Sequence, residues 1–158
     1  MIKVYPRLTT KAVHAVTMVV AGGAAVAGVW AVWESHALAQ PEPIPHLFSL
    51  HSWLGLAALA LAAAQLLLGL AIFLFPCAAS RLRAQYHHTH LFCGLAVLVL
   101  ATAASVVGLT EEAVFSLAST YPQLPGKGVL LNLTGLFLTL FTATVTFIAT
   151  KSSFKPLD

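Results

Sequence analysis

With 59% hydrophobic residues, 8% charged residues and a mean hydropathy of +0.89, this chain of 158 residues cannot be a soluble domain with a solvated surface. The composition indicates an integral membrane protein. The net charge of +3 is explained by the basic residues that flank membrane helices on one side, so it does not indicate a nucleic-acid-binding protein.

Four windows contain no Asp, Glu, Lys or Arg: residues 12–33, 47–80, 84–110 and 128–150. Each exceeds the ~20 residues that a helix needs to cross a hydrocarbon layer of ~30 Å. Backbone groups in lipid must be satisfied internally, and long unbroken runs favour helices over a closed barrel. We therefore predict an all-α membrane protein, a single domain 1–158 in which four transmembrane helices form a bundle, at about 8–33, 47–76, 84–110 and 128–150.

The first window and the three connections complete this topology. The window is too long for the hydrophobic region of a signal peptide, about 7–15 residues, so we predict a spanning helix. The connection at 34–46, "ESHALAQPEPIPH", carries three prolines and cannot continue a helix. The short connection at 76–83 predicts antiparallel neighbouring helices, and the longer one at 111–127 is predicted as a loop along the membrane surface.

The basic residues predict the orientation. Seven of the eight Lys and Arg residues fall in three segments that share one side of a four-pass topology: Lys3, Arg7, Lys11, Arg81, Arg83, Lys151 and Lys155. The opposite connections hold four acidic residues and one basic residue: Glu34, Glu42, Glu111, Glu112 and Lys127. Because cytoplasmic loops carry an excess of Lys and Arg, both termini are expected in the cytosol. Cys77 and Cys93 then lie in a reducing environment, where a disulfide is not expected.

Seven histidines are the chemically informative residues of this apolar chain. His14 and His90 enter their helices from the cytosolic side to a similar depth, whereas His51 enters from the other side. Both His51 and His90 are followed by a glycine at position i+4, Gly55 and Gly94, which leaves room on the same helical face.

Haem between helices explains this pattern, since it needs an axial nitrogen from each side and small residues beside the macrocycle. An alternative is that each histidine only hydrogen-bonds a neighbouring helix and the glycines only pack helices. Zinc is less favoured, because His87, His88 and His90 lack a carboxylate or thiolate at suitable spacing.

Four stretches carry a resemblance: "FSLHSWLG", "GLAIFLFPCAASRLR", "GLTEEAVFSL" and "GKGVLLNLTGL" are similar, in matching order, to those of the cytochrome b561 family. The resemblance implies a six-helix, two-haem, usually dimeric membrane oxidoreductase, of which this chain matches the last four helices. Such proteins pass electrons from cytosolic ascorbate to an acceptor across the membrane, either monodehydroascorbate or ferric iron. The implied location is the plasma membrane or an endomembrane.

The resemblance also implies roles for individual residues. His14 and His90 match the ligands of a cytosolic haem b, and His51 matches one ligand of a second haem near the opposite face. Arg7, Lys11 and Arg83 fall where the family binds ascorbate, although interfacial anchoring is an equal alternative for each of these cations. His36 resembles a family histidine near the site where electrons leave.

Departures from the family pattern leave the function open. The chain is expected to begin at the family's third helix, so that the histidine facing His51 is not in it and the second haem is one ligand short. His46 or another subunit could supply that ligand. The alternative to an active reductase is a non-catalytic membrane partner, or truncated isoform, that modulates a full-length relative through a homodimer or heterodimer.

Overall fold

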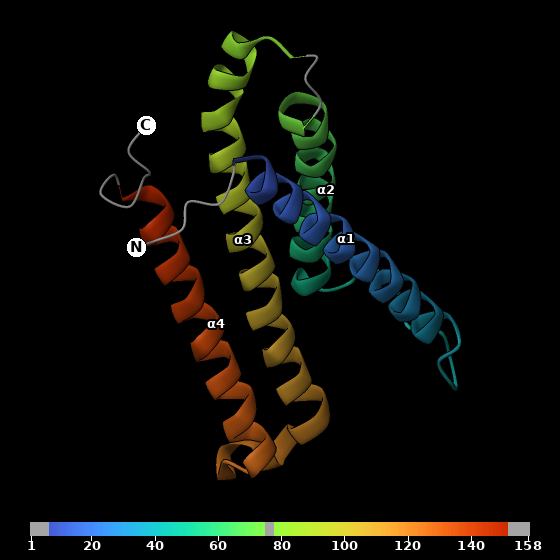
Figure 1. The fold of residues 1–158 in the computed structure, drawn as a ribbon. Coiled ribbons are helices and arrows are strands. Elements are labelled where there is room, and N and C mark those ends of the chain that lie inside the picture. The colour runs from blue at the N-terminus through green and yellow to red at the C-terminus, as the bar shows by residue number, and fades with distance from the viewer. Residues whose placement is uncertain (1–6, 75–77, 152–158) are drawn as a thin grey trace. The chain divides into compact units, whose positions relative to one another are not determined.

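The structure, a computed structural model, describes residues 7–74 and 78–151. Its elements are α1 (Arg7–Ala37), α2 (Leu50–Gly69), the π-helical turn η1 (Leu70–Leu74), α3 (Ser80–Leu117), the 3₁₀ helix η2 (Ala118–Gln123) and α4 (Gly126–Thr150), as Figure 1 shows. The described residues form helices and no strand, and four helical segments are long and apolar enough to cross a membrane. The predicted all-α membrane fold with four transmembrane helices is therefore confirmed.

The chain divides into two compact units. The first consists of Met1–Phe48 and Leu59–Gly94, and it holds α1, the second half of α2, η1 and the start of α3. The second consists of Ser49–Ala58 and Leu95–Asp158, and it holds the start of α2, most of α3, η2 and α4. The single-domain arrangement over 1–158 stays a prediction.

The start of α2 corrects the predicted boundary at residue 47. Leu47 has a φ of 55°, a left-handed value that interrupts a helix, and α2 begins at Leu50. The Ser49 hydroxyl accepts a hydrogen bond from the Ser52 backbone N–H at 3.3 Å, which is the N-cap arrangement. An uncharged window therefore marks the apolar stretch, but the capping serine decides where the helix starts.

The end of α3 corrects the predicted loop over 111–127. This helix continues past Glu111 and Glu112 to Leu117, and its 38 residues give a length of about 57 Å, more than a hydrocarbon layer of about 30 Å requires. Glutamate is a good helix former, so the acidic pair does not end the helix. Backbone geometry ends it instead: Ala118, directly after Leu117, adopts a left-handed φ of 42°, and the following η2 ends before Leu124, whose φ is 51°. α1 likewise continues past Glu34, and it ends at Ala37 instead of 33.

Small and hydroxyl side chains pack the second unit. Figure 1 shows α4 (orange to red) running antiparallel to the neighbouring part of α3. The buried residues described in this unit are Ala58, Ala104, Ala113, Gly128 and Thr142. Most large apolar side chains are exposed in the chain itself, as expected for helices whose outer faces meet lipid.

Candidate functional site

The imidazoles of His14 on α1 and His90 on α3 lie together in the first unit. Their ring centres are 6.4 Å apart, and their planes are nearly perpendicular at 89°. His14 is exposed and His90 is half-buried. The structure thus brings together the two residues that the sequence assigned to one level.

The distance between these ring centres equals that expected for one metal ion bound between two facing imidazole nitrogens. A metal–imidazole bond is about 2.0–2.1 Å long, and adding about 1.1 Å from nitrogen to ring centre on each side gives about 6.3 Å between centres. The observed 6.4 Å matches that value. The two neutral nitrogen donors are also the ligand type that a low-spin haem iron accepts on both faces.

The half-buried ring of His90 lies in an aromatic setting. Phe73 and Tyr86 have ring centres 5.2 Å and 5.9 Å from that of His90. The Gln65 amide donates to the Tyr86 hydroxyl at 3.4 Å. His90 Nδ1 is buried and has no hydrogen-bond partner among the described residues, and Gly69 of the neighbouring helix lies against the ring. This side of His90 is therefore closed and largely apolar.

His51 on α2 occupies a separate site in the second unit. Its Nδ1 lies 2.8 Å from the Ala104 carbonyl oxygen on α3, so Nδ1–H donates, which in a neutral ring places the lone pair on Nε2. A metal-binding histidine is commonly fixed in this way by its second nitrogen. Among the described residues, no second histidine ring contacts His51.

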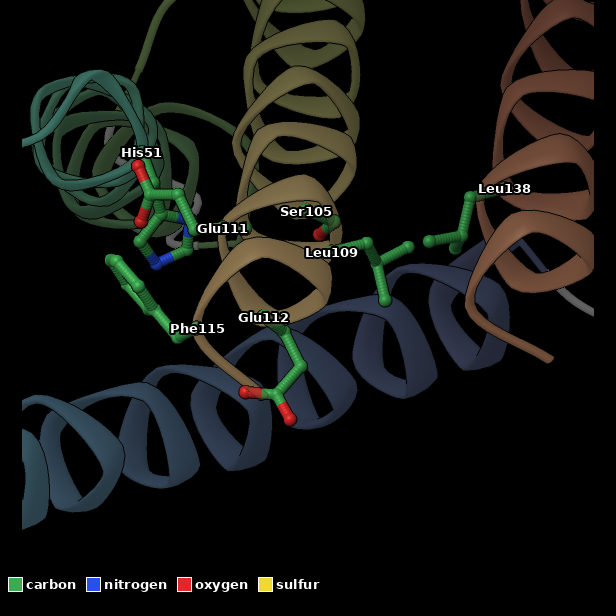
Figure 2. Close-up of a pocket in the computed structure, with 8 residues that line it drawn as sticks. His51, Ser105, Leu109, Glu111, Glu112, Phe115 and Leu138 are labelled. Carbon is green, nitrogen blue, oxygen red and sulfur yellow. The ribbon is translucent and has the colours of Figure 1, made fainter. Parts of the chain in front are cut away.

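An open cavity of about 400 Å³ adjoins His51. Its lining comes from α2, α3 and α4 and consists of His51, Ser105, Gly108, Leu109, Glu111, Glu112, Phe115 and Leu138. Figure 2 shows Glu111 and Phe115 on the His51 side of α3, while Leu109 faces Leu138 of α4. The site therefore combines one imidazole with apolar side chains and two carboxylates, those of Glu111 and Glu112.

The predicted ascorbate-binding cations are positioned by the same helices as His14 and His90. Lys11 is exposed one turn before His14, and Arg83 is half-buried two turns before His90, so each shares a helical face with its histidine. No described carboxylate forms an ion pair with Lys11 or Arg83. Arg7 begins α1, but its side chain lies outside the described residues.

His36 belongs to a ring cluster that the sequence did not predict. It lies in the last turn of α1, with its ring centre 5.5 Å from that of His46, and His46 stacks on Trp33 at 3.7 Å and 6°. His36 Nδ1 is buried without a hydrogen-bond partner among the described residues. His46, weighed above as a ligand donor, thus packs on a tryptophan. The spacing of Trp33 and His36 places both rings on one helix face and could have indicated part of this cluster. The position of His46 depends on how the loop after α1 folds back, which the sequence does not indicate.

A sequence profile described as eukaryotic cytochrome b561 matches residues 1–116, which include all seven histidines. The chain belongs to the cytochrome b561 family. A pig relative is 39% identical and a human relative 35% identical over 147 residues, and both are named transmembrane ascorbate-dependent reductase CYB561. A bovine relative named lysosomal membrane ascorbate-dependent ferrireductase CYB561A3 is 41% identical over 153 residues.

The matches to the pig and human relatives cover 93% of this chain, and the match to the bovine relative covers 95% of it. The same matches cover 57% of each relative. The chain thus spans a little over half the length of the cytochrome b561 relatives it matches.

Proposed function

We propose that this cytochrome b561 chain takes part in haem-based electron transfer from cytosolic ascorbate to an acceptor across the membrane, either monodehydroascorbate or ferric iron. The names of the relatives support the reaction class, since they describe ascorbate-dependent reductases and a ferrireductase. The observation that carries the proposal is the His14–His90 pair, with 6.4 Å between ring centres on separate helices.

His14 and His90 would hold haem b through one imidazole nitrogen each. A bound haem supplies a one-electron iron couple, and two histidine ligands leave no position for oxygen. The contacts of His90 support this role, because Phe73 and Tyr86 restrict its ring and keep water from one side.

His51 would supply one ligand of a second haem. Its hydrogen bond to the Ala104 carbonyl favours the tautomer with a free Nε2, which is the form that binds metal. The cavity beside it is apolar on most of its lining. We propose that the ligand facing His51 comes from another subunit, because members of the cytochrome b561 family are usually dimers.

Lys11 and Arg83, together with Arg7, would bind ascorbate. Ascorbate is an anion at neutral pH, and cations without carboxylate partners raise its local concentration and help orient it. Each of the two described cations lies on the face of a helix that also carries a haem ligand. Ascorbate bound there gives up one electron and one proton on the cytosolic side.

The membrane orientation, the site where electrons leave and the type of membrane follow from this assignment. We propose a multi-pass protein of the plasma membrane or an endomembrane, with both termini in the cytosol. His36 would lie beside the electron acceptor, in the ring cluster that it forms with His46 and Trp33. Replacing His36 by Ala should then slow acceptor reduction without altering the haem spectrum.

Redox difference spectra of the purified chain test the proposal. Ascorbate should reduce a bis-histidine haem, and the signal of the haem at His14 and His90 should be lost in His14→Ala and in His90→Ala but remain in His51→Ala. His88→Ala, on an exposed neighbour of the same helix, is the matched control. Well-folded protein with no Soret band would overturn the proposal and favour a non-catalytic membrane partner.

A further inference from the structure

Each of the two histidines proposed above as haem ligands on α2 and α3, His51 and His90, lies against a glycine of the other helix. In the second unit, a Cβ built on Gly108 of α3 would lie 2.7 Å from His51 Nδ1 and 3.0 Å from His51 Cε1. In the first unit, a Cβ built on Gly69 of α2 would lie 3.2 Å from His90 Cε1. We call Gly69 and Gly108 the ring-contact glycines.

The contact at Gly108 leaves no space for a side chain. Ordinary Cβ contacts lie at 3.4–4 Å, and real Cβ atoms essentially never come within 3.0 Å of another heavy atom. The three nearest atoms all belong to the His51 ring, which is rigid and already tied to the Ala104 carbonyl. An alanine at 108 must therefore move the ring, the helix or both.

Gly108 and Ala104, whose carbonyl is the hydrogen-bond partner of His51, lie against the same imidazole. Ala104 and Gly108 are separated by one helical turn, so the accepting carbonyl and the missing side chain face the same ring. The carbonyl fixes which nitrogen carries the proton, and the glycine fixes how closely the ring approaches α3.

Simple helix packing does not account for these contacts. Other packed glycines lie against other side chains: Gly135 has Leu109 Cδ1 at 3.6 Å, and Gly128 has Tyr121 Cδ2 at 3.2 Å. The nearest atoms at Gly69 and Gly108 are instead imidazole atoms. By contrast, Gly55 and Gly94, on the histidines' own helices, have nothing within 4 Å.

We propose that Gly69 and Gly108 are positioning residues that set the ring plane and Nδ1 environment of His90 and His51, and through them the spectroscopic and redox properties of the bound iron. The inference rests on the proposed function, because it takes these histidines as haem ligands. Orientation and hydrogen bonding of an axial ligand are two of the means by which a protein tunes haem iron.

The two positions should differ in tolerance. At Gly69 the built Cβ is 3.2 Å from His90, so a displacement of a few tenths of an ångström accommodates alanine. Gly69→Ala should therefore keep the haem but tilt the ligand, and Gly69→Val should do so more strongly. At Gly108 the 2.7 Å approach predicts that alanine breaks the His51–Ala104 hydrogen bond.

The first experiment needs no haem. Nitrogen-15 NMR of the full chain labelled at histidine, with the His51 signals assigned by their loss in His51→Gln, reports the hydrogen bond of Nδ1. Gly108→Ala should shift the His51 ring nitrogens, whereas Gly135→Ala, a packing glycine on α4, should leave them unchanged. An unshifted His51 in Gly108→Ala overturns the inference at this site.

The second experiment uses the haem-loaded chain. The low-spin EPR signal and the midpoint potential should both shift in Gly69→Ala and shift further in Gly69→Val, at unchanged haem content. Gly28→Ala, which has nothing within 4 Å, is the control for adding a methyl group to a helix. A loaded chain whose EPR signal and potential match the wild type in both Gly69 variants overturns the inference while the proposed function stands. A wild-type chain without haem overturns the proposed function, and NMR alone then decides whether the ring contact exists.

Discussion

Thr102 Oγ1 on α3 and Thr142 Oγ1 on α4 lie 2.5 Å apart and form a hydroxyl–hydroxyl hydrogen bond. Thr142 is buried, with 9% of its surface exposed. Interhelical hydrogen bonds in membrane proteins contribute about 0.6 kcal/mol on average and at most about 1.7 kcal/mol. Thr142→Val should therefore lower the free energy of unfolding in mixed micelles by an amount in that range.

The matched control for this substitution is Thr139→Val, because the Thr139 hydroxyl bonds the Gly135 carbonyl of its own helix. Its effect on unfolding should be smaller. Thr102→Val combined with Thr142→Val should cost no more than the larger single change, since both remove the same bond. Additive losses would show that the two hydroxyls do not depend on each other.

The ion pair between Lys127 and Glu112 should contribute little to stability. The two side chains approach to 2.6 Å, yet 51% and 48% of their surfaces are exposed. Exposed pairs typically contribute about 0.2–1 kcal/mol and are screened by salt. Lys127→Ala should lower the free energy of unfolding within that range, and less so at high salt. The charge swap Glu112→Lys with Lys127→Glu should recover most of the loss, and a loss well above about 1 kcal/mol would contradict this picture.

The Arg83 side chain should affect the binding of ascorbate and not the binding of haem. Arg83→Ala should slow haem reduction at low ascorbate by about 10-fold or more at low ionic strength, because local charge raises the anion's concentration near the site. Stopped-flow reduction, followed at the Soret band over a range of salt concentrations, measures this. Arg81→Ala, on an exposed side chain of the same helical turn, is the control. Equal slowing in both variants would indicate a general charge effect without a binding site.

Much of the fold could be predicted because the membrane imposes it. A run of apolar residues longer than ~20 specifies a spanning helix almost without tertiary information, and all four runs form helices. The ends of the helices were predicted less well. Charged residues mark where a helix leaves lipid, whereas the Ser49 cap and the left-handed Leu124 mark where α2 begins and the α3–η2 segment ends.

The candidate site was predictable in part for a related reason. The shared depth of His14 and His90 follows from helical rise and topology, so their proximity could be expected. The contacts of Gly69 and Gly108 could not, because they depend on which face of α2 meets which face of α3. The sequence directs attention to the glycines one turn after each histidine, and those glycines have open space beside them.

The stacked pair of Trp33 and His46 should hold the connection between α1 and α2. Their ring centres are 3.7 Å apart and almost parallel, and the Ile44 backbone N–H donates to the His36 carbonyl at 3.0 Å in the same segment. An aromatic pair contributes about 0.5–1.5 kcal/mol, which corresponds to a change of about 2- to 13-fold in a local opening equilibrium. His46→Ala should accelerate amide exchange at Ile44 by a factor in that range, measured by hydrogen–deuterium exchange. His46→Phe, which keeps a ring against Trp33, should exchange close to the wild-type rate. If Ile44 exchanges equally fast in all three proteins, the stack does not stabilise this connection.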